Sequence, residues 1–512
     1  MKTAAIVSEA LTSPIYQHLR ATPLTEAARL GAELGCRVLL KREDQQPVFS
    51  FKVRGAYHKM LKLPAAARRR GVVAASAGNH AQGVAHAARA LGLPSHIFMP
   101  EHTPSIKIQA VDAMGAKVFL HGNGFDQTLK AARAHARKHD LPLFHPFDDY
   151  DVICGQATIG AELLREMPPS TEAVFVACGG GGLLAGIAAV IKHLRPGIKV
   201  FGVEPVDAAC MDLALRKGRL AKLDYVGTFA ETVAVAQAGT RNFRICKEAV
   251  DGMFVVDIGA ICNAIKAVYE DTRTIVEPAG ALGVAGARAY HAAGRHKGGD
   301  LVPVVCGANM NFDALRYVIE RSAAGEDSEM LLAAEIPERP GSFLKLCRLL
   351  GKRQVREFNY RYSDSSQAHI FAGISVKDQA ERRQIVDNLA KRGITAHDLT
   401  GDETAELHVR HMVGGRTSVG INELVYRFEF PETAGALLNF LSRLQKDWNI
   451  SLFHYRFHGA DVGRVLIGFQ AEPGQRRQLT QAFDAIGYPY WPVSGNAAYG
   501  MFLADTKLSR PD

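Results

Sequence analysis

Short apolar runs alternate with longer helix-like stretches along residues 1–325. The runs that predict strands are residues 71–75, 95–99, 117–120, 173–177, 199–203, 252–256 and 301–305. Stretches rich in Ala and Leu, such as residues 81–90, 106–114 and 181–194, predict helices between them. This alternation predicts an α/β domain whose parallel sheet has helices on both faces. Ligands of such sheets bind at the carboxyl ends of the strands, so polar residues that follow a strand are the candidates for a site.

The composition changes after this region. Residues 322–329 are small, polar and acidic, which is typical of a linker. Beyond the linker the sequence repeats itself, because residues 335–341 resemble residues 429–435. A helical segment follows each of them (342–350 and 436–444), and then a strand (358–362 and 453–457). This order of elements indicates two similar small modules.

Each module fits the order strand, helix, strand, strand, helix, strand. In the first module the strands are predicted at residues 331–336, 355–362, 368–376 and 396–399. This order predicts a ferredoxin-like α+β fold. We therefore expect a first domain at residues 1–325 and two modules at residues 329–401 and 423–495.

The composition narrows the classes of function. Hydrophobic residues make up 47% and charged residues 22% of the 512 residues, which is typical of globular domains. No apolar run approaches the roughly 20 residues of a membrane helix, and the apolar stretch at the N-terminus is too short for the core of a signal peptide. Basic clusters have no interleaved aromatic residues, so we expect neither a nucleic-acid nor a membrane partner. The eight scattered cysteines contain no CxxC, which favours a reducing cytoplasm.

Lys52 is the first candidate for chemistry. It lies in Ser-Phe-Lys-Val-Arg-Gly-Ala-Tyr, where Ser50 is a suitable N-cap for a helix. In the first turn of a helix the macrodipole disfavours an ammonium group, and the apolar neighbours Phe51 and Val53 add desolvation. A lysine with a lowered pKa is more often the free amine that nucleophilic catalysis requires. An ordinary surface lysine is the alternative.

Four glycines, Gly179, Gly180, Gly181 and Gly182, follow an apolar strand and precede a helix. Without Cβ atoms the backbone can approach an anion closely and direct several N–H groups at it, so the turn predicts a phosphate site. Residues 180–185 also fit G-x-G-x-x-A, and Glu204 ends the next strand. That combination is typical of a dinucleotide site. A nicotinamide-dependent dehydrogenase is therefore an alternative at this point.

Two more turns follow predicted strands. Residues 76–83, Ser-Ala-Gly-Asn-His-Ala-Gln-Gly, offer N–H groups, a hydroxyl and an amide that suit a carboxylate. The alternative is a plain strand-to-helix turn capped by Asn79. Cys306 ends another strand, where a buried structural cysteine is the alternative. A Walker-type loop, HExxH and GxSxG are absent, so we expect neither a metal site nor a catalytic triad.

In combination, these motifs resemble a known family. Residues 50–57, 76–83, 179–183, 277–281 and 306–311 together are similar to fold-type II (tryptophan synthase β-like) enzymes that depend on pyridoxal 5'-phosphate (PLP). The tandem modules resemble ACT-like regulatory domains. With them the resemblance narrows to the biosynthetic threonine dehydratase (threonine ammonia-lyase) family and covers residues 14–502.

The resemblance implies a role for each matching residue. Lys52 would carry the cofactor and act as the catalytic base, and Cys306 would face the pyridine nitrogen, where the family often has serine. The residues that would contact the cofactor are Phe51, Lys52, Asn79, Gly179, Gly180, Gly181, Gly182, Leu183 and Cys306. The residues that would hold the substrate carboxylate are Ser76, Ala77, Gly78, Asn79 and His80.

The resemblance also implies an activity and its regulation. L-Threonine would lose its β-hydroxyl and yield 2-oxobutanoate and ammonia, the first step of isoleucine biosynthesis. Isoleucine would inhibit the enzyme and valine would oppose it, with a coupling free energy typically of about 1–3 kcal/mol. A cytoplasmic homotetramer is expected. The sequence assigns neither the residues that bind these effectors nor the group that protonates the leaving hydroxyl. For Glu204, binding of a cation is an alternative to the role in a dinucleotide site.

Three alternatives differ in what they leave unexplained. A serine dehydratase, or another PLP enzyme of the same fold, does not account for the tandem modules. A dehydrogenase leaves residues 50–57 and 76–83 without a role. A non-catalytic amino-acid sensor does not account for the lysine at position 52.

Overall fold

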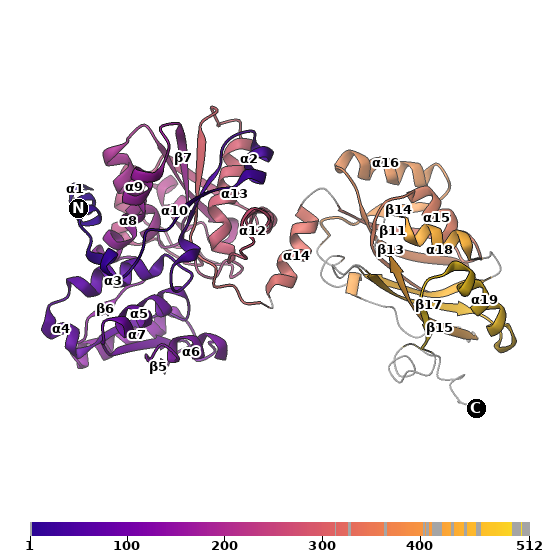
Figure 1. Cartoon of the computed structure of the whole chain (residues 1–512), viewed down its shortest axis with the longest axis horizontal. Helices are drawn as coiled ribbons and strands as arrows, with labels where there is room; N and C mark the ends of the chain where they lie inside the picture. Colours follow the sequence, from indigo (N-terminus) through magenta and orange to yellow (C-terminus); the bar gives the residue numbers. More distant parts are fainter. Residues whose placement is uncertain are drawn as a thin grey trace. The chain divides into compact units, whose positions relative to one another are not determined.

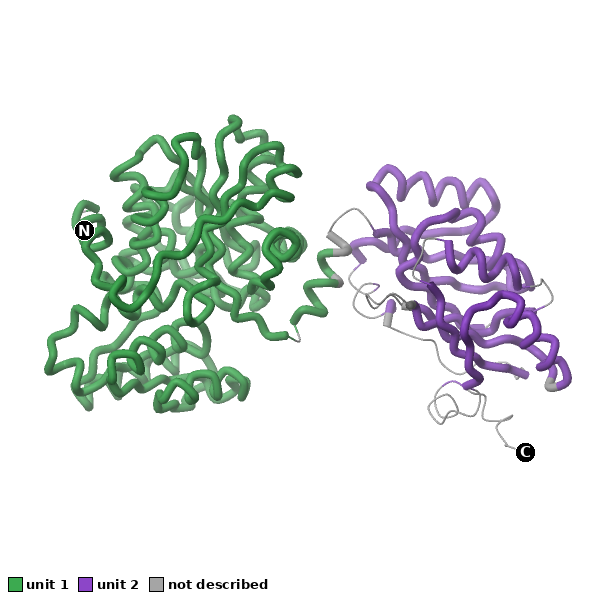
Figure 2. Tube along the Cα trace, viewed as in Figure 1, with its two compact units in different colours: residues 1–322 green, residues 323–512 purple. Residues whose placement is uncertain are grey.

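The computed structural model describes residues 3–312, 314–325, 329–362, 366–402, 405, 409–411, 422–431, 435–444, 448–456, 462–493 and 503. The chain divides into two compact units, Met1–Ser322 and Ala323–Asp512 (Figure 2). The predicted domain limits at residues 325, 329, 401 and 423 stay predictions. Parts of the predicted linker (326–328) and of the second repeat (432–434 and 457), and the predicted end at residue 495, lie outside the described residues.

The larger sheet of the first unit has six strands. Their order is β1 (Leu24–Glu26), β2 (Leu39–Arg42), β10 (Asp300–Val305), β7 (Thr171–Ala177), β8 (Lys199–Pro205) and β9 (Gly252–Val256). β1 and β2 pair antiparallel, and every other pair is parallel. The central strands β7, β8 and β10 are buried almost throughout, as continuously apolar runs require.

A smaller parallel sheet completes the first unit. Its order is β5 (Lys117–Leu120), β4 (Ser95–Met99), β3 (Val72–Ala75) and β6 (Leu143–Phe144). Every strand predicted in this unit is present, within two residues at either end. The sequence did not predict β1, β2 and β6. These strands are only two to four residues long, and β2 carries two buried charged residues, Lys41 and Arg42, so it has no apolar pattern.

Helices surround both sheets (Figure 1). Their bounds are α1 Thr3–Leu11, α2 Ala28–Leu34, α3 Lys52–Lys62, α4 Ala65–Arg70, α5 Asn79–Ala90, α6 Ser105–Asp112, α7 Phe125–Lys138, α8 Tyr150–Glu166, α9 Gly182–Leu194, α10 Cys210–Lys217, α11 Thr240–Ala249, α12 Ile258–Thr272 and α13 Pro278–Ala292. A further helix, α14 (Ala314–Gly325), follows and extends past the end of the first unit at Ser322. None of the helices in the described part of the chain is long and apolar enough to cross a membrane.

Helices α3 and α8 pack unusually closely. A Cβ atom built on Gly155 of α8 would lie 2.6 Å from the Cα atom of Gly55 in α3. One residue earlier, the fully buried guanidinium of Arg54 binds two buried carboxylates, with distances of 2.7 Å to Glu43 and 2.6 Å to Glu162. Because breaking a buried ion pair costs several kcal/mol, about 3–5, this network holds the N-terminal part of α3 in place.

The second unit is one eight-stranded antiparallel sheet made of two similar halves. The first half has β11 (Glu329–Pro337), α15 (Ser342–Leu350), β12 (Val355–Arg361), β13 (Gln367–Ser375), α16 (Gln379–Ala390) and β14 (Thr395–Asp398). The second half has β15 (Glu423–Pro431), α18 (Ala436–Arg443), β16 (Asn449–Arg456), β17 (Val462–Gln470), α19 (Arg476–Ile486) and β18 (Tyr490–Pro492). The predicted ferredoxin-like order is confirmed in both.

The two halves meet at a pair of strands. The strand order is β14-β11-β13-β12-β16-β17-β15-β18, and β12 pairs antiparallel with β16. Helices α15 and α18, one from each half, pack against each other. Each of these helices follows a glycine with a left-handed backbone, Gly341 (φ +89°) and Gly435 (φ +88°), so the predicted repeat has the same turn in both copies.

Candidate active site

All the predicted cofactor residues line one cavity in the first unit. They come from the start of α3, from the turn between β7 and α9, from the start of α5 and from the end of β10. The lining also includes Phe147, Thr232, Val233, Glu277 and Ala279. The carboxyl ends of the strands therefore form the site, as the α/β pattern predicted.

A larger, open cleft adjoins this cavity. The predicted substrate residues Ser76, Ala77, Gly78, Asn79 and His80 line it. Lys52 and Asn79 line both spaces. A group held by the side chain of Lys52 would therefore meet a molecule that enters from the cleft.

Lys52 is the first residue of α3 and is partly buried. Its Nζ donates a hydrogen bond to the carbonyl oxygen of Pro146 at 3.0 Å. Burial lowers the pKa of Lys52 from 10.5 to about 8, although Cys306 and Glu277 act in the opposite direction. The predicted direction is therefore confirmed, with desolvation as the main cause. The predicted N-cap was Ser50, but the residue at the cap position is Phe51, which has helical backbone angles. The hydroxyl of Ser50 still accepts a long hydrogen bond of 3.4 Å from the N–H of Lys52.

The four glycines form a tight turn before α9. A Cβ atom on Gly180 would lie 2.3 Å from the ring of Phe147, and Gly181 has a φ of +90° that favours glycine. Asn242 fixes the turn by donating to the carbonyl oxygen of Gly180 at 2.7 Å. In the described part of the chain, no residue accepts a hydrogen bond from the N–H groups of the four glycines. Free N–H groups at the start of a helix suit a phosphate.

The turn at residues 76–80 joins β3 to α5. The N–H of Gly78 donates to the hydroxyl of Ser76 at 3.2 Å. The ring of His80 is buried, with Nε2 at 3.0 Å from the carbonyl oxygen of Phe144, and burial lowers its pKa to about 3. The ring is therefore neutral and bound to the protein, so a substrate carboxylate would meet the backbone of His80 rather than its ring.

Asn79 is not the helix cap that the alternative interpretation assumed, because Gly78 occupies the cap position. The side-chain amide of Asn79 is held at both ends. Its Nδ2 donates to Oε1 of Glu277 at 2.8 Å, and its Oδ1 accepts from Nδ2 of Asn309 at 2.8 Å. These contacts fix which end of the amide carries the oxygen.

Cys306 lies at the end of β10 and is buried. Its Sγ donates to the carbonyl oxygen of Ala279 at 3.3 Å. Burial raises the pKa of the thiol well above its usual range, so the thiol is neutral. A neutral group at this position leaves a pyridine nitrogen largely unprotonated, unlike an aspartate.

Glu204 does not serve a dinucleotide. Its carboxyl is fully buried and accepts the N–H groups of Met211 and Asp212, both at 2.9 Å. It therefore caps the start of α10 and is not free to bind a ribose hydroxyl. Among the residues that the structure describes, no group of three His, Cys, Asp or Glu side chains is placed to hold a metal ion.

Sequence reasoning missed Glu277 and several other residues that line the cavity, among them Phe147, Thr232 and Val233. It also missed the buried Arg54, which does not line the cavity but holds the start of α3. Arg54 and Glu277 lie within the motifs that carried the resemblance, but neither had been given a role. Both are ionisable residues that the fold buries, and burial cannot be read from a short motif. The one signal available was the Glu-Pro pair at 277–278, where an acid directly precedes the first residue of a helix.

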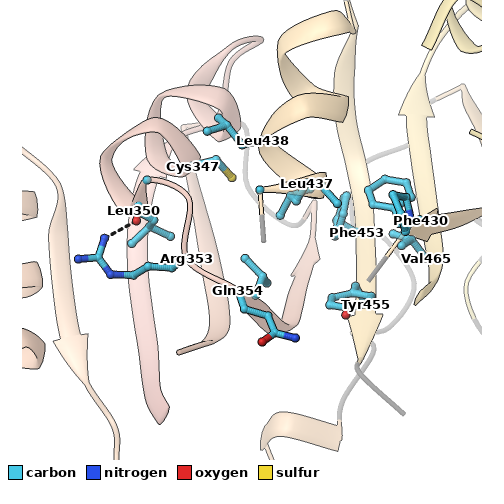
Figure 3. A pocket seen from close by; sticks show the side chains of 15 residues that line it. Cys347, Leu350, Arg353, Gln354, Phe430, Leu437, Leu438, Phe453, Tyr455 and Val465 are labelled. Carbon is cyan, nitrogen blue, oxygen red and sulfur yellow. Dashed lines mark hydrogen bonds between the residues drawn. The ribbon is translucent and has the colours of Figure 1, made fainter. Parts of the chain in front are cut away.

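The second unit has a cavity of its own, which lies between α15 and α18 (Figure 3). It is lined by Cys347, Leu350, Gly351, Arg353, Gln354, Val355, Phe430, Pro431, Gly435, Ala436, Leu437, Leu438, Phe453, Tyr455 and Val465. Hydrocarbon and aromatic side chains dominate this inter-module cleft. The guanidinium of Arg353 is engaged with the carbonyl oxygen of Leu350 and with Glu381.

The arrangement in the first unit fits one cofactor chemistry. A lysine with a lowered pKa suits an aldehyde, free N–H groups in a glycine turn suit a phosphate, and a neutral thiol suits an unprotonated pyridine. Together with the two-sheet α/β fold, this site defines a PLP-dependent enzyme.

Comparison with known proteins identifies the family. Residues 15–307 match the family of pyridoxal-phosphate dependent enzymes, and residues 320–409 and 414–503 match the C-terminal regulatory domain of threonine dehydratase. The chain is 47% identical to L-threonine dehydratase biosynthetic IlvA of Pasteurella multocida, over 98% of both chains. It is 46% identical to the protein of that name from Escherichia coli, over 96% of both. The chain belongs to the biosynthetic threonine dehydratase family.

Solved structures agree with this assignment. The processed form of threonine deaminase isoform 2 from Solanum lycopersicum is 44% identical, with a TM-score of 0.61 over 63% of this chain and 88% of that chain. A T.th. threonine deaminase is 38% identical, with a TM-score of 0.56 over 60% of this chain and 98% of that chain.

Proposed function

We propose that the protein is a threonine ammonia-lyase that converts L-threonine to 2-oxobutanoate and ammonia with PLP. The observation that carries this proposal is the position of Lys52, which lines both the cofactor cavity and the open cleft. Family membership supports the choice of threonine over other hydroxy amino acids.

The cofactor and Lys52 have different roles in the reaction. PLP, when bound, supplies an electron-accepting system that stabilises negative charge at the α-carbon of an amino acid. The Nζ of Lys52 would hold the cofactor, and its amine, when free, would take the α-proton of threonine. With a pKa of about 8, this amine is a base that is deprotonated in part near neutral pH.

Two groups of backbone donors position the reacting molecules. The N–H groups of the four glycines hold the cofactor phosphate. The turn at residues 76–80 holds the threonine carboxylate, and it lies at the start of α5, where the helix macrodipole favours an anion. The neutral thiol of Cys306 would face the ring nitrogen of the cofactor, and a neutral partner there would favour elimination over transamination.

The second unit is the regulatory part of the enzyme. Isoleucine inhibits by binding there, and valine opposes it. The inter-module cleft suits a branched aliphatic side chain, because burying one Leu-sized side chain contributes about 1.5–3 kcal/mol. The proposed modules at residues 329–401 and 423–495 each supply one wall.

The proposed assembly is a homotetramer in the cytoplasm. All eight cysteines are unpaired in the structure, which is typical of proteins in a reducing compartment. The family resemblance supports the tetramer, and sedimentation equilibrium of the purified chain tests it.

Reductive trapping tests the central proposal. Borohydride treatment of the purified yellow protein, followed by peptide mass spectrometry, should place the cofactor on Lys52. A tag on another residue, or a colourless chain, contradicts the proposal. Release of 2-oxo acid from serine but not from threonine would favour a serine dehydratase instead.

Truncation tests the regulatory proposal. A chain that ends at Gly325 should retain threonine turnover and lose inhibition by isoleucine. Inhibition that survives the truncation would place the effector site in the first unit.

A further inference from the structure

Glu277 lines the cofactor cavity but has no role in the mechanism above. It is 3% exposed and directly precedes α13. Its backbone is fixed by a hydrogen bond from its N–H to the carbonyl oxygen of Gly307 at 3.2 Å. A buried carboxyl needs hydrogen-bond partners or a proton, because burial penalises an isolated charge.

The two carboxyl oxygens of Glu277 have different surroundings. Oε1 accepts hydrogen bonds from Nδ2 of Asn79 at 2.8 Å and from the hydroxyl of Thr232 at 3.2 Å. Oε2 is buried and has no hydrogen-bond partner among the described residues. An ionised carboxylate accepts at both oxygens, whereas a neutral acid has one accepting oxygen and one O–H donor. The asymmetry therefore matches a neutral acid whose proton is on Oε2.

The charges around Glu277 are consistent with this protonation state. Burial raises the pKa of Glu277 to about 7, and Glu231 acts in the same direction. The hydrogen bonds from Asn79 and Thr232 and the charge of Lys52 act in the opposite direction. Cys306, which also interacts with Glu277, is neutral.

Asn79 presents a second donor beside this acid. Its Oδ1 is taken by Asn309, and one N–H of its amide is taken by Glu277. No residue in the described part of the chain accepts the other N–H. With Glu277 in its neutral form, the cavity would contain two polar donors, the N–H of Asn79 and the O–H of Glu277, for which no acceptor is present among the described residues. A bound ligand would supply that acceptor.

We propose that Glu277 binds the cofactor as a neutral acid. The O–H at its Oε2 donates a hydrogen bond to an acceptor oxygen of bound PLP, beside the free N–H of Asn79. This inference rests on the proposed function, since it assumes that PLP fills the cavity. It adds a cofactor-binding residue, and it makes cofactor affinity depend on the protonation of a side chain other than Lys52.

The test measures PLP binding to the cofactor-free full-length chain, by the visible absorbance of the bound cofactor, at pH 6, 7 and 8.5. Glu277→Gln keeps an acceptor and a donor without a titrating proton, so its dissociation constant at pH 6 should stay within about threefold of wild type. Glu277→Leu has neither, and it should bind at least about tenfold more weakly. Wild type should weaken relative to Glu277→Gln as the pH rises from 6 to 8.5, because the acid then loses the donated proton.

A matched control removes a carboxyl elsewhere. Glu33→Gln changes an exposed acid that pairs with Arg288. The ratio of its PLP dissociation constant to that of wild type should not vary with pH. If Glu277→Gln binds PLP as weakly as Glu277→Leu at pH 6, the ionised form is the one required and the inference is wrong. Unchanged binding by Glu277→Leu also overturns it. If wild type itself binds no PLP, the proposed function fails instead. If Glu277→Leu does not fold, the ratio of the PLP dissociation constants of wild type and Glu277→Gln still tests the inference, because this ratio should change with pH.

Discussion

The cavity beside Lys52 and the inter-module cleft both have apolar side chains in their lining, but they differ in the polar groups that these side chains surround. The first contains a glycine turn with free N–H groups and three ionisable side chains, Lys52, Glu277 and Cys306, each with a pKa shifted by burial. The second is lined mainly by hydrocarbon and aromatic side chains, and its one guanidinium is already engaged by Leu350 and Glu381.

The difference matches the role that we propose for each space. Proton transfer near neutral pH needs groups whose pKa values lie near 7, and burial produces such values. Recognition of an aliphatic effector needs apolar area that water leaves on binding. A substitution should therefore have large effects on turnover in the first cavity and small effects on turnover in the second.

The largest effect is expected for Lys52→Ala. Without the amine, the chain loses both the cofactor attachment and the base, so kcat should fall by at least about 10³-fold, since general base catalysis alone contributes about 10²–10⁴-fold. The measurement is ammonia release at saturating threonine and PLP. Activity within tenfold of wild type would show that another group acts as the base.

The next effect concerns the reactivity of the Lys52 amine in the cofactor-free chain. With a pKa of about 8, roughly a fifth of Lys52 is unprotonated at pH 7.4, about 200-fold more than for a lysine with the ordinary pKa near 10.4. The extent of acylation by a limiting reagent, read by peptide mass spectrometry across pH 6–10, should show a midpoint near 8. A midpoint above 10 contradicts the desolvation argument.

Gly181→Ala should weaken PLP binding by about 10–100-fold. The φ of +90° strains any side chain, at about 1–2 kcal/mol, and the new Cβ atom would lie 2.4 Å from Cε of Met211. The matched control is Gly218→Ala, which has a similar left-handed backbone (φ +66°) but no atom within 4 Å of its Cβ position. If both variants lose affinity equally, strain at the phosphate turn is not the cause.

The smallest effect on turnover is expected in the inter-module cleft. Leu437→Ala enlarges the cleft, so the isoleucine concentration for half inhibition should rise about tenfold, in line with the 1.5–3 kcal/mol for burying such a side chain. Activity without isoleucine should change less than twofold. The control Leu389→Ala removes a buried leucine of α16 that does not line the cleft. Equal loss of inhibition in both variants would indicate a general loss of stability.

Long apolar strands and the repeat made most of the fold predictable. The continuously apolar composition of strands such as β7 and β8 predicts that they are buried. The repeated Pro-Gly spacing predicts the two halves of the second unit. β2 was missed because half of it is charged. The buried charges of Lys41 and Arg42 are neutralised by carboxylates, by the distant Glu162 for Lys41 and by the nearby Asp44 for Arg42.

The site was predictable where a residue type is tied to a local shape. The glycine turn and Lys52 are examples, because the motif of each predicts both the local backbone conformation and the chemical group that it presents. Glu277 and Arg54 depend on partners more than 100 residues away, Asn79 and Glu162 respectively, which no local pattern reveals. The role of the His80 ring was also out of reach, because it depends on the carbonyl oxygen of Phe144.

The pairing of β12 with β16 has a consequence for how the regulatory part can be handled. Cutting the chain between its two halves would expose the backbone N–H and C=O groups of both strands along a freshly opened sheet edge. Such an edge is a template for aggregation. Either half produced alone should therefore self-associate or precipitate, and the two must be expressed together to remain soluble.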